Sequence, residues 1–413
     1  MSRIAVIGAG ISGLATSWLL SRRHDVVLLE QSGRIGGHTH THCFDTPDGR
    51  LALDTGFLVH NTRTYPLLVR LFEELGVACL DSDMSFGVTD PSSGFEYSTR
   101  NLNGLFADRR NLWRPRHYAM LAGILRFNRA SRALAARPTT ITLGDFLRQH
   151  HLSGDVVDRF LLPLAAAIWS ASPSTLRDFP ALTLVRFFQQ HGMNTVLDHP
   201  TWRVVAGGSA TYIPKLLASP RITVRTNAGP SSVQRTMDGV DIHFPDRPTE
   251  RVDEVVFACH GDDVLPLLAD PTDTERDILG QFQTSANLAI LHTDDTWLPR
   301  RAAARASWNY TLSGSTGAAT VTYDLNRLQR LSTTRPYLVT LNPERPIAPY
   351  QQLATMHYTH PLYTRAAIAA QERWAEVSGH HRTHYCGAYW FYGFHEDGLR
   401  SAVRVANMMG IEW

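Results

Sequence analysis

Lysine is nearly absent from the sequence, because Lys215 is the single lysine among 40 basic residues and the others are arginines. The 38 acidic residues almost balance these cations and leave a formal net charge of +2, so the chain lacks the broad positive field of a non-specific nucleic-acid-binding protein. Charged residues make up 19% and hydrophobic residues 43%, which excludes a disordered chain and a coiled coil. A length of 413 residues predicts two to three globular domains.

Cysteine is also scarce. The four cysteines, Cys43, Cys79, Cys259 and Cys386, form no C-x-x-C pair, which argues against a zinc site or a disulfide framework and favours a reducing, cytoplasmic setting. No apolar run is long enough to span a bilayer. The apolar run after Arg3 is interrupted by glycines and lacks a small-residue cleavage site, so we interpret it as a strand, a turn and a helix rather than a signal peptide.

A dinucleotide-binding pattern opens the chain. Residues 4–7 predict a strand buried on both faces, and residues 14–20 have helical composition. In the turn between them, Gly8 permits the tight bend, Gly10 lets a pyrophosphate approach the backbone, and Gly13 allows close packing of helix on strand. The full turn, which we expect to contact the cofactor, reads Gly8-Ala9-Gly10-Ile11-Ser12-Gly13.

An acidic residue completes this pattern. The second predicted strand, Asp25–Leu29, ends in Glu30, which is followed by Gln31. A carboxylate about twenty residues after the glycine turn accepts hydrogen bonds from ribose hydroxyls, while the helix N-terminus offers N–H groups to phosphates. These residues predict a Rossmann-type α/β domain that binds a dinucleotide.

The continuation after Glu30 distinguishes among dinucleotides. Gly33-Arg34-Ile35-Gly36-Gly37 gives E-x-x-G-R-x-G-G, and here the sequence resembles the flavin amine oxidase superfamily, which includes phytoene desaturases and protoporphyrinogen oxidase. The resemblance implies FAD, with Arg34 and the glycine pair along its pyrophosphate and ribityl chain and with His38 and Thr39 as further contacts. Asp54-Thr55-Gly56-Phe57 resembles the family's next turn, beside the flavin ring.

Histidines alternate in His38-Thr39-His40-Thr41-His42, which predicts three imidazoles on one face of an extended strand. Such a face suits a metal ion. No acidic or histidine partner follows at ligand spacing, so we expect no metal site and interpret these side chains as hydrogen-bond donors near the flavin or as polar packing.

The periodicity then changes along the chain. Helical spacing predicts helices over Tyr65–Gly76, Pro115–Ala136, Thr142–His151, Asp155–Trp169 and Thr211–Ala218. Strands are predicted over Ile222–Asn227, Ser232–Thr236, Val240–Phe244, Glu254–Cys259, Asn287–Thr293, Ala318–Asp324 and Tyr337–Asn342. In the resembled family, a W-x-x-x-x-G-G stretch such as Trp202–Gly208 marks the return to the FAD domain.

We therefore expect two interleaved domains. The FAD-binding domain comprises residues 1–63, 198–270 and 380–413 and combines a parallel sheet with a three-stranded β-meander. The substrate domain is α+β, with a largely helical part at 64–197 and a β-sheet at 271–379. This arrangement is similar to amine oxidases and glutathione reductase.

The resemblance also assigns cofactor contacts in the second half of the chain. Val233 corresponds to a backbone contact with the adenine, and Ala258 and Cys259 lie on the strand that returns to the cofactor. The C-terminal motif comprises a strand over Tyr385–Tyr389, with Gly387 and Ala388, and a helix to about Met409 whose first turn supplies Glu396, Asp397, Gly398 and Leu399. We interpret Cys386 as buried packing rather than as a covalent flavin link.

The candidates for catalysis lie in the same C-terminal stretch: Tyr389, Tyr392, His395 and Glu396. The tyrosines would wall the flavin or donate hydrogen bonds, and His395 would move a proton near neutral pH. Many amine oxidases of the superfamily hold a lysine under the flavin, but the corresponding strand, Asn287–Ile290, has none. Lys215 is predicted to lie on a solvated helix, so the usual amine-oxidase apparatus is missing.

Our leading hypothesis is an FAD-dependent oxidoreductase that desaturates or isomerises an apolar, acyl or polyene-like substrate. The chain is most similar to bacterial FAD-binding proteins related to the N-terminal domain of plant cyclopropane fatty acid synthases, through Asp81–Phe86, Asn101–Phe106, Ala306–Tyr310 and Gly393–Gly398. The alternatives are an amine oxidase and a non-catalytic flavin-bound partner of a lipid methyltransferase. Substrate, electron acceptor, reaction direction and oligomeric state stay open.

The Arg109–Arg116 region surrounds Trp113 with arginines and precedes an apolar helical stretch. Such a segment favours peripheral contact with an anionic membrane or a role in guiding an acyl carboxylate. The alternative is an ordinary solvated helix face. No nucleic-acid partner is expected.

Overall fold

The computed structural model describes residues 1–136, 139–193, 200–312 and 319–413. One half of the molecule is built on a five-stranded sheet in the order β10-β2-β1-β14-β20, with every neighbouring pair parallel. Its strands are β1 (Arg3–Ile7), β2 (Asp25–Leu29), β10 (Ile222–Arg225), β14 (Glu254–Phe257) and β20 (Thr383–Tyr385). Residues 4–7 of β1 are apolar and buried, because β1 packs against the helix that follows it and against an antiparallel meander as well as between its neighbouring strands.

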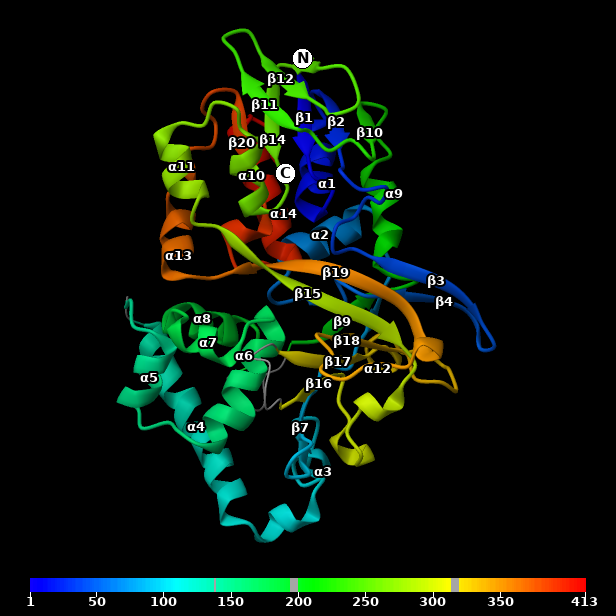
Figure 1. The fold of residues 1–413 in the computed structure, drawn as a ribbon, viewed down its shortest axis with the longest axis vertical. Helices are drawn as coiled ribbons and strands as arrows, with labels where there is room; N and C mark the ends of the chain where they lie inside the picture. Colours follow the sequence, from blue (N-terminus) through cyan, green and yellow to red (C-terminus); the bar gives the residue numbers. More distant parts are fainter. Residues whose placement is uncertain (137–138, 194–199, 313–318) are drawn as a thin grey trace.

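The glycine turn leads from β1 into α1 (Ile11–Leu20), and the C-terminal helix α14 (His395–Met408) packs along α1. Figure 1 shows these two helices between the parallel sheet and the middle of the molecule, above α2 (Pro66–Glu74). The three-stranded antiparallel meander consists of β11 (Ser232–Arg235), β12 (Val240–His243) and β13 (Glu250–Val252). The ends of β1, α1 and α14 therefore meet at one edge of the parallel sheet.

The other half contains a seven-stranded mixed sheet in the order β19-β15-β18-β17-β16-β7-β8. Its longest strands, β15 (Gln283–His292) and β19 (Gln352–Leu362), form an antiparallel pair that crosses the middle of the molecule (Figure 1). The other strands are β7 (Phe86–Asp90), β8 (Phe95–Ser98), β16 (Trp308–Thr311), β17 (Thr320–Asp324) and β18 (Leu338–Leu341). The β15–β19 pair places the outer strands of this sheet beside the cofactor-binding half.

Helices cover one flank of the mixed sheet and enclose a second apolar core, which includes Phe127, Phe146, Phe187 and Phe188. They are α3 (Leu102–Leu105), α4 (Pro115–Ala135), α5 (Leu143–Gln149), α6 (Leu162–Trp169), α7 (Pro173–Asp178) and α8 (Ala181–Gln190), with the 3-10 turn η1 (Arg109–Trp113) before α4. At the far end of the molecule from the parallel sheet, η1 and the start of α4 form the tip (Figure 1).

Shorter elements complete the chain. The hairpin β3 (Thr41–Thr46) and β4 (Gly49–Asp54) stands apart from a small sheet of β5 (His60–Asn61), β9 (Trp202–Val205) and β6 (Cys79–Asp81). The remaining helices are α9 (Ile213–Leu216), α10 (Gly261–Leu267), α11 (Asp273–Leu279), α12 (Leu325–Leu328) and α13 (Arg365–Glu372).

The predicted fold class is confirmed: a parallel-sheet α/β half with a three-stranded meander is combined with an α+β half that contains the mixed sheet. Three local predictions were wrong. The C-terminal strand ends at Tyr385, and Ala388–Trp390 form a 3-10 turn. The helix predicted over Asp155–Trp169 divides into a π-helical segment, Val157–Leu161, and α6, which has Pro163 in its first turn. Only part of Thr211–Ala218 is helical, as η3 (Ser209–Tyr212) and α9.

The three alternating histidines do not all share one face: the rings of His40 and His42 lie 4.0 Å apart, but His38 belongs to the turn before β3 and contacts Tyr358 and His360 instead. The predicted strand start at Ala318 and the predicted domain boundary at residue 198 lie outside the described residues.

Candidate flavin site and its surroundings

The glycine turn between β1 and α1 forms an open cradle. A side-chain carbon on Gly8, whose φ is +104°, would lie 2.8 Å from the backbone of Ala258, and one on Gly13 would overlap the Gly8 carbonyl. A carbon on Gly10 would meet no atom within 4 Å. Two of the glycines are therefore required by packing, whereas Gly10 leaves free space beside the N-terminus of α1, where a dinucleotide phosphate binds.

Glu30 closes one side of this cradle. Its carboxylate accepts hydrogen bonds from the Ala9 N–H at 3.0 Å and from the Ser32 N–H at 2.9 Å. These bonds fix the carboxylate at the end of β2, where a ribose would be recognised. Gln31 is exposed next to it.

A second glycine turn lies directly on the first. The Gly36 N–H donates to the Ala9 carbonyl at 2.8 Å, and a side-chain carbon on Gly37 would lie 3.0 Å from the Gly10 Cα. Arg34 donates to the carbonyls of Gly37 at 2.8 Å and Thr39 at 3.2 Å, so its guanidinium holds the turn in shape. Gly33 precedes this turn and packs near Asn227.

The turn at residues 54–57 is tied to the same region. The Phe57 N–H donates to the His38 carbonyl at 2.7 Å, and Gly56 leaves no space for a side chain against His38. The buried Asp54 carboxylate accepts from the Ser209 N–H at 2.9 Å, and burial raises its pKa to about 6. Asp54 thus fastens this turn to the chain after Gly208, a role that the sequence did not reveal.

The N-terminus of α14 closes the site from the other side. A side-chain carbon on Gly398 would lie 2.7 Å from Ile11 and 2.8 Å from the Ser12 hydroxyl, so the first turns of α14 and α1 are in contact. The His395 ring stacks on Phe57 with centroids 3.7 Å apart, and its Nε2 lies 3.0 Å from the Thr39 hydroxyl. Burial lowers the pKa of His395 to about 3, so this imidazole is neutral.

The other candidates from the C-terminal motif have different surroundings. Tyr389 is buried against Phe282, whereas Tyr392 packs with Phe187 in the second core, so the structure does not bring the two tyrosines together. The Glu396 carboxylate accepts from the N–H groups of Leu67 at 3.1 Å and Leu68 at 3.0 Å. Glu396 therefore caps α2.

The remaining predicted contacts are buried or lie within the backbone network. The Val233 carbonyl accepts from the Ala269 N–H at 3.0 Å, and the Ala258 N–H donates to Ile7 at 2.8 Å. The Asp397 carboxylate accepts from the Phe394 N–H at 3.0 Å, and burial raises its pKa to about 7. Burial raises the pKa of the Cys259 thiol, and the Gly387 N–H donates a hydrogen bond to the Ser401 hydroxyl at 2.9 Å. The hydroxyls of Thr55 and Tyr358 form a hydrogen bond at 2.8 Å. Ala388 lies in its 3-10 turn, and Leu399 is buried.

Cys386 is buried, and its sulfur lies 3.3 Å from the Thr16 hydroxyl. Burial raises the pKa of this thiol to about 11, which keeps it protonated.

Lys215 is exposed, and its ammonium donates to the carbonyls of Leu75 at 2.9 Å and Gly76 at 2.7 Å. The single lysine of the chain therefore caps the C-terminus of α2, which is a structural role.

A group of side chains lies beside the 34–39 turn, and of its members the sequence singled out only His38 as a cofactor contact. We call it the histidine cluster, and it consists of His38, His260, His360, Tyr358 and Asn287. The His38 ring stacks on Tyr358 at 5.1 Å and lies 5.2 Å from His360. His38 Nε2 is shielded from solvent and has no hydrogen-bond partner among the described residues.

Two imidazoles of this cluster, His38 and His360, are uncharged. Burial and the neighbouring His360 and His260 lower the pKa of His38 well below its usual value. Burial together with His260 lowers the pKa of His360 to about 4. At neutral pH each ring therefore offers one N–H donor and one acceptor nitrogen.

A chain of hydrogen bonds fixes the tautomer of His360. The Leu288 N–H donates to Asn342 Oδ1 at 3.0 Å, which leaves the Asn342 amide group to donate to Asn287 Oδ1 at 2.9 Å. Asn287 then donates through Nδ2 to His360 Nδ1 at 3.2 Å. Because Nδ1 accepts, the proton of neutral His360 is on Nε2.

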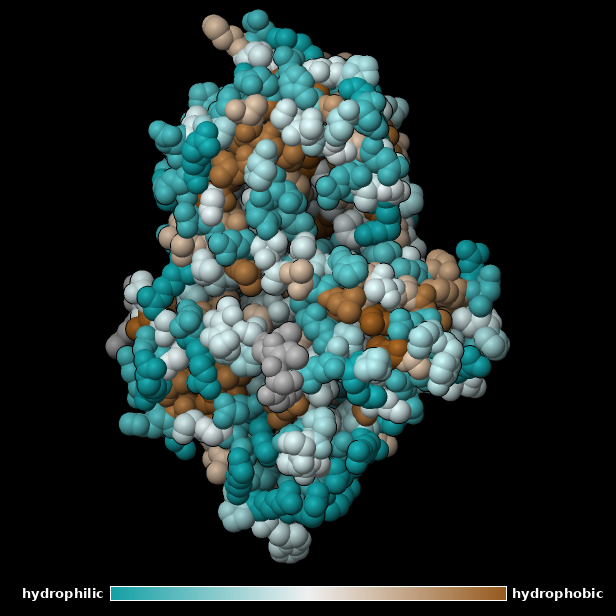
Figure 2. Space-filling view, viewed as in Figure 1, coloured by the Kyte–Doolittle hydropathy of each residue, from teal (hydrophilic) through white to brown (hydrophobic). Residues whose placement is uncertain are grey.

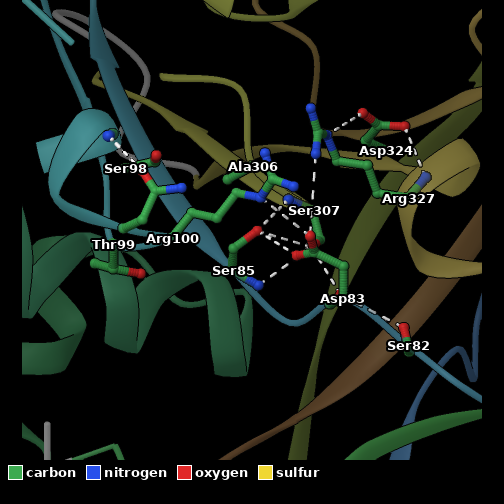
Figure 3. Close-up of polar contacts among 12 residues, drawn as sticks. Ser82, Asp83, Ser85, Ser98, Thr99, Arg100, Ala306, Ser307, Asp324 and Arg327 are labelled. Atoms are coloured by element: carbon green, nitrogen blue, oxygen red, sulfur yellow. Dashed lines mark hydrogen bonds and ion pairs between the residues drawn. The ribbon is translucent and has the colours of Figure 1, made fainter. Parts of the chain in front are cut away.

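A different polar group, which we call the Asp83 junction, joins three segments of the chain (Figure 3). It consists of Asp83, Ser85, Arg100, Ser307 and Arg327. The Asp83 carboxylate accepts from the hydroxyls of Ser85 at 2.6 Å and Ser307 at 2.7 Å, and it lies 3.3 Å from the Arg100 guanidinium. These hydroxyls and arginines hold the pKa of Asp83 below its usual range.

Among the described residues, no group of three histidine, cysteine or carboxylate side chains is arranged to hold a metal ion. In the same part of the chain, no helix is long and apolar enough to cross a membrane.

Comparison with known proteins agrees with this geometry. The family model for flavin containing amine oxidoreductase matches residues 11–409. Tryptophan 2-monooxygenase from Allorhizobium ampelinum is 34% identical over 103 residues, which span 24% of this chain and 14% of that protein.

Solved structures resemble the fold along nearly its whole length. A CLA-producing fatty acid isomerase from P. acnes superposes with a TM-score of 0.71 at 15% identity, covering 97% of each chain. Putrescine oxidase bound to putrescine gives 0.69 at 14% identity, covering 99% of this chain and 98% of that one. Cyclohexylamine oxidase from Brevibacterium oxydans gives 0.68 at 15% identity, covering 99% of each chain. At such identities the likeness establishes the fold and leaves the substrate undecided.

Proposed function

The chain belongs to the family of flavin-containing amine oxidoreductases, and from this premise we propose that it desaturates or isomerises an apolar, acyl or polyene-like substrate. It is an FAD-dependent oxidoreductase. When bound, FAD supplies a hydride acceptor, and in its reduced form a hydride donor, at N5 for a substrate C–H bond. The residues of this chain decide which substrate reaches it.

The open space at Gly10 and the orphaned His38 Nε2 both fit a bound flavin dinucleotide. We propose that the N-terminus of α1 and the glycine pair Gly36-Gly37 bind its phosphates, that Glu30 binds its ribose, and that the α14 N-terminus lies near the ring. Arg34 acts by holding the second glycine turn. This division of roles accords with the proposed FAD-binding domain of residues 1–63, 198–270 and 380–413 and the substrate domain of 64–197 and 271–379.

The proposal that the substrate is apolar is supported by the neutral state of His38 and His360 in the histidine cluster. His38 and His360 are neutral, and the neighbouring Tyr358 and Asn287 bear no charge. Among the described residues, neither His38 nor His360 forms an ion pair with a carboxylate. A substrate ammonium would lose its hydration here without gaining an anionic partner, whereas an uncharged chain would lose little.

The hydrogen-bond chain from Leu288 to His360 supports a specific role for that histidine. It keeps a proton on His360 Nε2, on the ring edge away from Asn287. We assign His360 as a hydrogen-bond donor in the reaction and Asn287 as the residue that positions it. The site then offers an oriented neutral donor where many amine oxidases of the superfamily hold a lysine.

The C-terminal candidates take supporting roles in this proposal. His395 holds the Phe57 turn through stacking and the Thr39 hydroxyl. Glu396 positions α2 against α14. Tyr389 contributes a buried wall whose hydroxyl has no partner among the described residues and remains available to a ligand.

Oxidation of an amine or amino-acid derivative is the second candidate. The family description and the 34% identity to a segment of tryptophan 2-monooxygenase favour it. It requires a binding mode in which the substrate nitrogen is uncharged or meets a carboxylate outside the histidine cluster.

Anaerobic flavin reduction separates these candidates. The FAD-loaded protein is mixed, without oxygen, with primary amines, unsaturated fatty acids and polyenes of matched chain length, and the flavin absorbance and products are followed. We expect bleaching or double-bond movement with the acyl or polyene panel and no bleaching with amines. Bleaching by amines alone would overturn the proposal and establish the second candidate.

A further inference from the structure

Charge is strongly segregated along one stretch of the chain. Between Thr99 and Gly144 the sequence contains nine arginines and a single acidic residue, Asp108, although the whole chain is nearly neutral. Eight of these arginines lie in the described part of the chain, and seven of them are on or next to η1 and α4. A local positive surface of this kind attracts polyanionic partners over about a Debye length.

The tip of this stretch also exposes large apolar side chains. Trp113 at the end of η1 is 87% exposed, Leu102 on α3 is 75% exposed, and Leu125 on α4 is 61% exposed. Figure 2 shows the end of the molecule that η1 forms in Figure 1 as mostly hydrophilic on the face in view. An exposed tryptophan within a cationic surface is typical of contact with the headgroup region of a membrane.

Only some of the arginines are neutralised by carboxylates. Asp108 lies 2.9 Å from the Arg110 guanidinium and 3.4 Å from that of Arg114, and Arg116 pairs with Asp155. Within the described chain, four others make no ion pair: Arg109, Arg126, Arg129 and Arg132. Their charges remain available to a partner.

The outer face of α4 repeats the same combination. This 21-residue helix contains no acidic residue, and its exposed positions include Tyr118, Leu125, Arg126, Arg129 and Arg132. Tyr118, Leu125, Arg129 and Arg132 follow one another at intervals of seven, four and three residues, and Arg126 is next to Leu125, so these side chains share one side of the helix. The helix stays attached to the second core through its other face, where Phe127 is buried.

We propose that η1 and the exposed face of α4 dock onto the surface of an anionic lipid bilayer. The arginines attract the negatively charged headgroups, and Trp113 and Leu125 enter the interfacial region. A nucleic acid would satisfy the arginines but would bury neither exposed leucine, so the bilayer is the partner that uses both features. The inference concerns a surface distinct from the flavin site, and it stands whether the substrate is an amine or an acyl chain.

Vesicle co-sedimentation tests this surface. The FAD-loaded protein is mixed with equimolar phosphatidylcholine–phosphatidylglycerol vesicles and, separately, with phosphatidylcholine vesicles, and the bound fraction is measured as salt is raised. We expect binding to the anionic vesicles that weakens with salt, because screening shortens the reach of the arginine charges. Little binding to the neutral vesicles is expected.

Matched variants separate the effect of the arginines on α4 from the effect of the net charge of the protein. R126Q/R129Q/R132Q should lower binding about a hundredfold, since each arginine near an anionic surface contributes roughly fivefold. R50Q/R276Q/R335Q removes the same charge from other exposed positions and should leave binding within about twofold. Trp113→Ala should lower binding about tenfold, whereas Tyr350→Ala, which removes an equally exposed aromatic ring elsewhere, should not.

Circular dichroism and flavin spectra establish that each variant is folded and loaded. Three results would overturn the proposal: no binding to anionic vesicles at low salt, equal binding to neutral vesicles, or equal loss in both triple variants. Preferential binding to RNA that is lost in R126Q/R129Q/R132Q, without vesicle binding, would assign the surface to nucleic acid instead.

Discussion

The histidine cluster and the Asp83 junction are both polar groups assembled from distant segments beside the mixed sheet, yet they differ in one physical respect. At the junction, two hydroxyls and an arginine fill the acceptor sites of Asp83 (Figure 3). In the cluster, His38 Nε2 is buried with no partner among the described residues. The Asp83 carboxylate has its partners within the protein, whereas His38 Nε2 retains hydrogen-bonding capacity.

This difference separates a structural group from a binding site. A satisfied buried network stabilises the fold, whereas a buried polar atom without a partner costs about 1–3 kcal/mol. A ligand bound beside His38 would complete this atom. Gly10 shows the same property in the backbone, since it borders free space while Gly8 and Gly13 are closely packed.

Acid should affect the two regions differently, and this is the largest effect we expect. Burial places the pKa of His360 at about 4 and that of His395 at about 3, below the unfolded value of 6.5. The unfolded chain therefore binds more protons as the pH falls below 6.5, and the two histidines together remove about 5 kcal/mol of unfolding free energy between pH 7 and pH 4.5. Urea titrations across this range measure the loss.

The Asp83 junction is insensitive in that window. The lowered pKa of Asp83 keeps its stabilisation present above the unfolded carboxyl value and removes it only at lower pH. His360→Asn should flatten the pH dependence, and Asp83→Asn should not. Because burial also raises the pKa of Asp54 and Asp397, whose protonation acts in the opposite direction, the comparison with the parent decides: an identical pH dependence in His360→Asn and the parent would contradict a neutral, buried His360.

Gly10→Val should block the cofactor without disturbing the fold. A Cβ at this position meets no protein atom within 4 Å, and the side chain extends into the space expected for the dinucleotide phosphates. We expect the Kd for FAD to rise at least about a hundredfold, which is about 2.7 kcal/mol, with an unchanged circular dichroism spectrum. Gly13→Val is the contrasting variant, because it overlaps the Gly8 carbonyl and should not fold. Unchanged FAD affinity in Gly10→Val would place the cofactor elsewhere.

In contrast to Gly10→Val, Asp83→Ala should lower the stability of the protein and leave its FAD affinity nearly unchanged. It removes the acceptor for the Ser85 and Ser307 hydroxyls and the partner of Arg100, which costs about 2 kcal/mol of unfolding free energy at this partly exposed site. FAD affinity should stay within about twofold. Thermal unfolding measures the stability, and FAD titration measures the affinity. A loss of FAD affinity without loss of stability would show that the Asp83 junction belongs to the flavin site.

Asn287→Leu should produce the smallest effect. It removes the donor that fixes the His360 tautomer but leaves the cofactor cradle intact. We expect the flavin reduction rate to fall about fivefold to tenfold, the worth of one buried hydrogen bond, with unchanged FAD affinity. Asn342→Ala should give a similar loss because it interrupts the same chain upstream. If Asn342→Ala leaves the rate and its pH profile unchanged, the hydrogen-bond chain does not position His360.

Local motifs made the cofactor cradle predictable from the sequence. Each glycine from Gly8 to Gly13 acts within one turn, and Glu30 follows at a spacing set by a single strand-helix-strand unit. The β-strand predicted over Tyr385–Tyr389 was too long because an apolar run contains no signal for the 3-10 turn that follows Gly387.

The histidine cluster was not predictable in the same way. Asn287 and His360 meet because β15 and β19 pair over their whole length, and that register is set by the completed sheet. The one local signal was the spacing of Tyr358 and His360, which places both on the same face of a strand. Lys215 likewise gave no sign that it caps α2, since its acceptors lie far away in sequence.

Nitrogen-15 NMR of the histidine rings, with and without FAD, tests the central claim most directly. His360→Asn and His38→Asn assign the signals. We predict that His360 is neutral with its proton on Nε2 down to about pH 5, and that the signals of His38 and His360 shift when FAD binds, whereas that of the partly exposed His243 in the meander does not. If His38 and His360 titrate near pH 6.5 and ignore FAD, the histidine cluster is not part of the flavin site.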